Sequence, residues 1–110
     1  MATVRNLGEF EQLILLAILR LRDKAYGISI RAEISARTGR QTTRGALYAT
    51  LERLEDKGFV KSRMGDPTPE RGGRAKRYYT VSAMGVRAIV QAQRAYRQML
   101  DGLEIGGLHA

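Results

Sequence analysis

The sequence predicts a mainly α-helical fold with a small antiparallel β wing, that is, a winged helix-turn-helix followed by a C-terminal dimerisation helix. Three observations predict it. Two stretches with the apolar spacing of helices are joined by the short, glycine-containing segment 39–42, as in a helix-turn-helix. Two strand-like stretches then flank a loop that holds both prolines, as in a wing. In a last stretch, apolar residues recur at alternating intervals of three and four.

The first predicted helix runs from Leu7 to about Arg22, with Gly8 near its start. It is apolar almost all round, and such a helix must be covered on more than one side. A chain of 110 residues builds only a modest core, so one of these sides is expected to face a second subunit. Leu13 and Leu16 are assigned to that contact.

The second helix is predicted from about Lys24 to Thr38. Asp23 is expected to cap it, because an aspartate side chain can accept the unpaired N–H groups of a first turn. Gly39 is expected to end it in the left-handed conformation, which glycine adopts without steric cost. The short segment up to Thr42 then leads into the next helix.

The third helix is predicted over about Thr42 to Lys57, with Gly58 just past its end. Either Thr42 or Thr43 can cap its first turn. Its apolar stripe, which is expected in the core, consists of Leu47, Leu51 and Leu54. Its outer face begins with very small residues beside a cation and a phenol, namely Arg44, Gly45, Tyr48 and Ala49. A face of this kind can lie close against a negatively charged partner.

The wing is predicted from two strands, Phe59 to Met64 and Arg74 to Val81, on either side of the loop 65–73. It carries the densest basic patch of the chain, Lys61, Arg63, Arg71, Arg74, Lys76 and Arg77, against Asp66 and Glu70. Side chains alternate between the two faces of a strand. Tyr78 and Tyr79 must therefore face opposite ways, and one of them is expected in the core.

The last helix is predicted over about Ala83 to Leu103, with Ser82 as its cap. Its apolar seam consists of Ile89, Ala92, Tyr96, Met99 and Leu103. One exposed helix cannot bury its own seam, which favours contact with a second copy of the chain. Packing of the seam within the monomer is the alternative.

Composition narrows the function classes. The formal net charge of +8 and the isoelectric point near 10.4 fit a polyanionic partner, nucleic acid first and acidic membrane second. Without cysteine there is no disulfide, thiol nucleophile or thiolate metal site. The one histidine, His109, has no nucleophile beside it in any known pattern, and no motif of paired carboxylates or metal ligands occurs. No catalytic residue, metal or cofactor is expected. The apolar runs are too short to span a membrane, so a cytoplasmic protein is expected.

Several motifs, in this order and at these separations, resemble the PadR family of prokaryotic transcriptional regulators. The resemblance covers about Leu7 to Gly85. The motifs are Leu7–Gly8–Glu9–Phe10–Glu11, Ala25–Tyr26–Gly27, the run from Arg44 to Glu55, Lys57–Gly58–Phe59–Val60, and the run from Arg71 to Tyr79 with Gly72–Gly73 and Tyr78–Tyr79.

The resemblance implies a homodimer that binds a pseudo-palindromic operator on double-stranded DNA, usually as a repressor. It also implies dimer contacts from the first and last helices, in the short form with a single C-terminal helix. Some PadR-like proteins are released from DNA by a small aromatic or hydrophobic effector, and some drug-sensing members stack it on a tryptophan at the dimer centre. This chain has no tryptophan and departs from that pattern.

The candidate DNA-binding residues lie at the mouth of the third helix and at the tip of the wing: Thr42, Thr43, Arg44, Gly45, Tyr48, Arg71, Gly72, Gly73, Arg74, Lys76 and Arg77. Arg44 is the candidate for a guanine, since its fork matches O6 and N7, although a phosphate contact is equally open. Against these roles, Thr43 can be a cap only, Tyr48 can pack under the wing, and the wing cations can be merely solvated.

The predicted function is a sequence-specific DNA-binding transcriptional regulator, a homodimeric repressor on an inverted repeat. The chain then divides into a DNA-binding domain at 1–81, a dimerisation helix at 82–105 and a flexible tail at 106–110. The alternatives are a winged-helix protein-interaction module whose basic face meets an acidic partner, and a small-molecule-binding protein without operator function.

Overall fold

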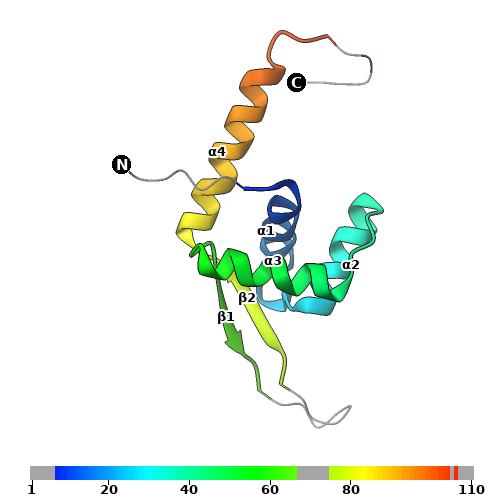
Figure 1. The fold of residues 1–110 in the computed structure, drawn as a ribbon, viewed down its shortest axis with the longest axis vertical. Helices are drawn as coiled ribbons and strands as arrows, with labels where there is room; N and C mark the ends of the chain where they lie inside the picture. Colours follow the sequence, from blue (N-terminus) through cyan, green and yellow to red (C-terminus); the bar gives the residue numbers. More distant parts are fainter. Residues whose placement is uncertain (1–6, 67–74, 105, 107–110) are drawn as a thin grey trace.

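The computed structural model describes residues 7–66, 75–104 and 106. Its elements are α1 (Glu9–Leu21), the short 3₁₀ helix η1 (Arg22–Lys24), α2 (Gly27–Thr38), α3 (Arg44–Asp56), β1 (Val60–Met64), β2 (Arg77–Val81) and α4 (Ala83–Leu100). The α3 helix crosses in front of α1, the wing extends from this body in one direction and α4 in another (Figure 1). The predicted fold class, mainly helical with a small antiparallel wing, is confirmed.

The core lies where α1, α2 and α3 meet, and the base of the wing closes it. Its largest fully buried side chains are Ile14, Leu15, Ile18, Ile30, Leu47, Leu51, Leu54 and Val60. The leucine stripe of α3 is thus core, as predicted, and the opposite face of this helix is left to the solvent. Ile89, from the first half of α4, belongs to the same core cluster.

The predicted start of the second helix at Lys24, with Asp23 as cap, is wrong. The helix α2 begins at Gly27, and the hydroxyl of Ser29 accepts a hydrogen bond from the N–H of Tyr26 at 3.0 Å. The chain is extended just before, because the Ala25 carbonyl accepts a 2.9 Å hydrogen bond from Tyr79 N–H of β2. Pairing with the wing therefore overrides the local capping signal. The predicted stop at Gly39, with φ 74°, is confirmed.

The helix α3 is slightly shorter than predicted, and its cap is Thr43. The Thr43 hydroxyl accepts a hydrogen bond from Ala46 N–H at 3.0 Å, so Thr42 lies outside the helix. The helix ends at Asp56, and Gly58 follows in the left-handed conformation with φ 81°, as predicted. The first helix is likewise trimmed, from the predicted 7–22 to Glu9–Leu21, with Gly8 as its N-cap residue.

In the wing, Ser62 pairs with Tyr79 and Met64 with Arg77. Both strands begin later than predicted, β1 at Val60 and β2 at Arg77. Most of the predicted loop, including Arg71, Gly72 and Gly73, lies outside the described residues, and so does Arg74, the predicted start of the second strand. Of the two neighbouring tyrosines, Tyr79 is the core residue, 5% exposed, and Tyr78 is half-buried.

The helix α4 starts as predicted and ends early. Ser82 caps it by accepting from Gly85 N–H at 3.1 Å, and the same hydroxyl donates to the Gly58 carbonyl at 2.6 Å. A Cβ at Gly85 would collide with the Phe59 carbonyl, so only glycine allows this close approach to the turn after α3. The helix stops at Leu100, and the predicted extension to Leu103 is wrong: Leu103 lies beyond the helix.

Candidate nucleic-acid interface

The N-terminal half of α3 presents an open outer face. Arg44, Gly45 and Ala49 are exposed, and a Cβ added at Gly45 would meet nothing within 4 Å. The Arg44 guanidinium lies 5.9 Å from the ring centroid of Tyr48, which leaves the cation at the rim of this face. A second macromolecule can therefore approach the backbone of this turn closely.

Tyr48 joins this face to the start of α2. Its side chain is 40% exposed, and a Cβ at Gly27 would collide with its hydroxyl and ring. The phenol is thus packed against the first residue of α2, where glycine alone fits. The alternative in which Tyr48 packs under the wing holds in part. The side chain lines a hollow with Arg77 and Tyr79 of the wing, but its hydroxyl packs against α2.

The two threonines before α3 differ in how open their hydroxyl groups are. The Thr43 hydroxyl accepts the capping bond, and the Thr42 hydroxyl is buried without a hydrogen-bond partner among the described residues. The Thr42 carbonyl accepts from Arg31 Nε at 2.9 Å, which fixes the turn. The exposed Thr43 hydroxyl still has its proton to donate to a partner, whereas the Thr42 hydroxyl is buried.

Arg77 of the wing faces the outer surface of α3. It shares an open hollow of about 560 Å³ with Tyr48, Ala49, Glu52, Glu55 and Tyr79. Its Nη1 donates to Ser62 Oγ at 3.0 Å, and Ser62 Oγ donates to Glu55 Oε2 at 2.8 Å. Burial raises the pKa of the Tyr79 hydroxyl, and Arg77 opposes this shift.

Glu55 and Ser62 were not among the site residues expected from the sequence. Ser62 could have been found from the alternation of side chains along β1, which turns Ser62 towards α3.

The other face of the wing carries a ladder of cations and rings. Lys76 Nζ lies 4.4 Å from the ring centroid of Tyr26, the rings of Tyr26 and Tyr78 meet edge to face at 5.7 Å, and the Arg63 guanidinium lies 4.9 Å from Tyr78. Such contacts hold a cation in place while its charge stays at the surface. The sequence pointed to Lys76 and Arg63 as wing cations, while the role of Tyr26 as their support depends on its pairing with Tyr78.

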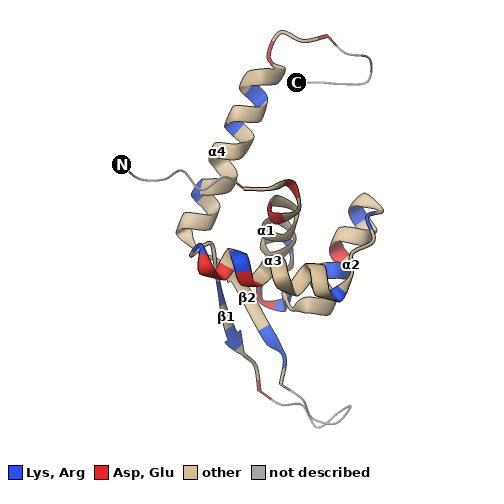
Figure 2. Cartoon of the chain, in the orientation of Figure 1, with Lys and Arg blue, Asp and Glu red and all other residues tan. Residues whose placement is uncertain are grey.

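Charge is unevenly distributed along this surface (Figure 2). The C-terminal half of α3 carries three carboxylates and one cation, namely Glu52, Arg53, Glu55 and Asp56, whereas its N-terminal end carries Arg44 alone. Both wing strands carry cations, among them Lys61, Arg63 and Arg77. These charges favour contact of a polyanion with the N-terminal end of α3 and with the wing over contact with the far end of α3.

Comparison with known proteins identifies the family. The model of the transcriptional regulator PadR-like family matches residues 15–91. This chain belongs to the PadR-like family. The predicted resemblance is confirmed, and the chain is a DNA-binding transcriptional regulator. The match includes α3 and the wing and stops at Gln91, within α4.

Solved structures agree with this PadR-like fold. A transcriptional regulator from Clostridium thermocellum is 24% identical over 82% of this chain and 84% of its own, with a TM-score of 0.68. A PadR family transcription regulator from Clostridium difficile is 22% identical over 82% and 90%, with a TM-score of 0.66. RosR from H. salinarum is 24% identical over 93% and 84%, with a TM-score of 0.69. No curated protein matches the sequence.

The dimerisation candidates of this PadR-like regulator fall into three groups by their exposure. Tyr96 and Met99 are 68% and 80% exposed, and Leu16 and Leu103 are exposed as well. Leu13 and Ala92 are half-buried, and Ile89 is part of the monomer core. The apolar seam thus begins in the core of one chain and continues on α4 as a surface that this chain does not cover.

Two further findings concern other kinds of site. Within the part of the chain that the structure describes, no group of three or more His, Cys, Asp or Glu residues could hold a metal ion. Among the same residues, no helix has the length and apolar character needed to cross a membrane.

Proposed function

We propose that this PadR-like regulator is a homodimeric repressor that binds an inverted-repeat operator, with the N-terminal half of α3 in the major groove and the wing on the adjacent backbone. The observation that carries this proposal is the arrangement of Arg44, Tyr48 and Arg77 around the small-residue face of α3. The cations flank a surface whose central residues, Gly45 and Ala49, have little or no side chain. Such a surface lets a helix come close to the edges of bases.

Each residue then has a role. Arg44 reaches a guanine, whose O6 and N7 atoms match a guanidinium fork, or a neighbouring phosphate. Gly45 allows the close approach, and Tyr48 contacts a phosphate. Arg77 and Lys76 contact phosphates from the wing, and the same role is proposed for the tip residues Arg71, Gly72, Gly73 and Arg74.

Dimerisation supplies the second half-site. The exposed apolar side chains of α4, with Leu13 and Leu16 of α1, form the proposed contact with the second copy. Burial of the exposed methionine and tyrosine side chains against a partner removes apolar surface from water and so stabilises the dimer. A small aromatic or hydrophobic effector is proposed between the paired α4 helices. As a prokaryotic regulator, the protein would act in the cytoplasm.

Selection of random DNA duplexes on the purified protein tests the proposal. The expected product is an inverted repeat whose half-sites are about 34–36 Å apart, one helical turn, or a multiple of that spacing. Affinity for the selected duplex should fall steeply with salt, because phosphate neutralisation releases counterions. Equal binding to other polyanions, with no enriched motif, would contradict the proposal and favour a protein-interaction module.

A further inference from the structure

A single hydroxyl connects α3 to the second wing strand. Ser62 of β1 donates to Glu55 Oε2 of α3 at 2.8 Å, and it accepts from Arg77 Nη1 of β2 at 3.0 Å. The register explains why the three meet. Ser62 lies opposite Tyr79, which is in the core, so Ser62 faces the same side of the wing as Tyr79 and Arg77.

The direction of both hydrogen bonds is fixed by the chemistry of the end groups. A guanidinium can only donate, and an ionised carboxylate can only accept. The single proton of Ser62 must therefore point to Glu55, and its lone pairs are then left for Arg77. Hydrogen bonds in such a chain polarise and strengthen one another. The carboxylate thus aligns the hydroxyl, and the hydroxyl aligns the guanidinium.

The consequence is an oriented cation at the rim of the α3 face. A guanidinium has five N–H donors in a rigid fork, and one atom of this fork is held by Ser62. Arg77 itself is exposed and lines the hollow in front of Ala49 and Tyr48. A free arginine side chain samples many rotamers, and a side chain that is held beforehand loses less entropy when it binds.

We propose that Ser62, aligned by Glu55, is a positioning residue for DNA binding: it holds Arg77 at the angle at which the remaining donors meet the phosphate backbone beside the groove that α3 enters. This role rests on the proposed function. It assigns Ser62 no contact of its own with DNA, so all of its effect on binding must pass through Arg77.

A double-mutant cycle tests this. Operator affinity is measured by titration for the wild type, Ser62→Ala, Arg77→Ala and the double variant, at two salt concentrations. We expect Ser62→Ala to weaken binding roughly three- to tenfold, the size of one hydrogen bond. In the Arg77→Ala background the same change should have no further effect. Equal losses in both backgrounds would overturn the inference, because a merely structural role would not depend on Arg77.

Two variants separate the hydroxyl from general damage to the wing. Ser62→Thr keeps the hydroxyl and should bind within about twofold of the wild type, since the hydrogen bonds can be retained. Thr80→Val removes a hydroxyl from the exposed, opposite face of β2 and should bind like the wild type. A Ser62→Thr variant as weak as Ser62→Ala, or an equal loss in Thr80→Val, overturns the inference. If the wild type itself shows no preference for duplex DNA, the proposed function fails too; if only the coupling is absent, the proposed function stands.

Discussion

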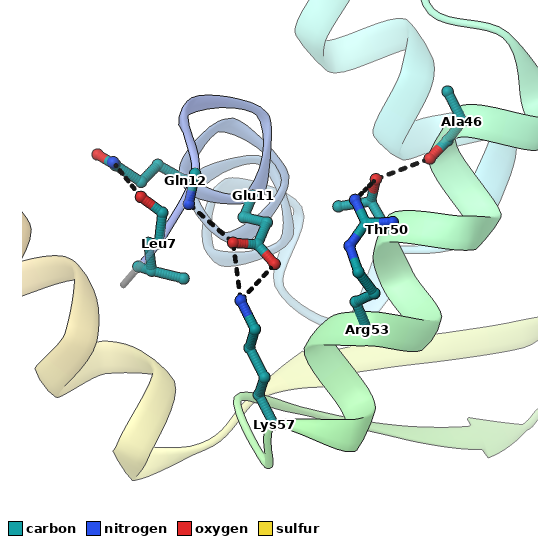
Figure 3. A network of polar contacts seen from close by, with 8 residues as sticks. Leu7, Glu11, Gln12, Ala46, Thr50, Arg53 and Lys57 are labelled. Carbon is teal, nitrogen blue, oxygen red and sulfur yellow. Dashed lines mark hydrogen bonds and ion pairs between the residues drawn. The ribbon is translucent and has the colours of Figure 1, made fainter. Parts of the chain in front are cut away.

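The ammonium group of Lys57, one residue past α3, donates to both carboxylate oxygens of Glu11 in α1, at 3.0 and 2.8 Å (Figure 3). Glu11 is 6% exposed and also accepts from Gly8 N–H at 2.8 Å. The pair ties the end of the proposed DNA-reading helix to the first turn of α1. Glu11 is almost fully buried and Lys57 is partly exposed, so the carboxylate charge is the more costly of the two to leave unpaired.

The first prediction is that Glu11→Ala lowers the free energy of unfolding by about 2–4 kcal/mol, since the part-buried Lys57 ammonium loses both carboxylate oxygens as acceptors. Urea unfolding measures it. Glu9→Ala is the matched control: Glu9 pairs with Arg40 at the surface, and such pairs contribute about 0–1 kcal/mol. Equal effects of the two variants would show that the pair contributes no more than a surface contact.

The second prediction concerns pH. Burial alone would raise the pKa of Glu11, but hydrogen bonds from Lys57 and Gly8 outweigh it and hold the pKa below its ordinary value. A lowered carboxyl pKa stabilises the fold above the unfolded pKa, and this stability is lost as the pH falls through the folded value. The free energy of unfolding should therefore decrease as the pH falls below about 4.3, and this decrease should be smaller in Glu11→Gln. If the variant loses as much stability in acid as the wild type does, another carboxyl group is responsible for the loss.

The third prediction separates stability from binding at Gly45. The position is inside α3 and a Cβ there meets nothing, so Gly45→Ala should stabilise the protein by about 0.5–1 kcal/mol. The same methyl group would stand between α3 and the floor of the groove and should weaken operator binding. Thermal unfolding and DNA titration together check both signs; tighter binding by this variant would argue against groove entry by this turn.

The fourth prediction distinguishes reading from anchoring. Arg44→Ala should relax sequence preference at one base pair of each half-site, by about 1–3 kcal/mol. Arg77→Ala should instead weaken binding to all duplexes and reduce the salt slope by about one phosphate. Titrations on operator and scrambled duplexes at two salt concentrations measure both. An unaltered salt slope for the Arg77 variant would show that Arg77 contacts no phosphate.

The fifth prediction tests the α4 surface. Met99→Asp places a charge on a strongly exposed apolar position and should give a monomer in sedimentation, because burying an unpaired charge in an interface is costly. Gln91→Asp changes an exposed polar position of the same helix and should leave the dimer intact. A dimer of normal strength in the Met99 variant would place the interface elsewhere.

Sequence periodicity predicted the helices well and their ends less well. The leucine stripe of α3 and the glycines at 39 and 58 act locally, and the structure confirms them. The start of α2 depends on a hydrogen bond between Ala25 and Tyr79, which lie far apart in the sequence. The helix start predicted from the local capping signal at Asp23 was therefore wrong. In the same way, the cations of the candidate interface could be named from the sequence, while the hydrogen-bonded chain Glu55–Ser62–Arg77 required the strand register.

The turn after α3 is shared by three elements. Lys57 reaches α1, the Gly58 carbonyl accepts from Ser82 at the start of α4, and Gly85 packs on the Phe59 carbonyl. Because the turn is fixed at these points, little freedom is left for a hinge between α3, the proposed DNA-reading helix, and α4, the proposed dimer helix. In a dimer built through α4, the distance between half-sites is then decided where the two chains touch. A change that rotates one α4 against the other alters which operators fit, without altering any residue that contacts a base.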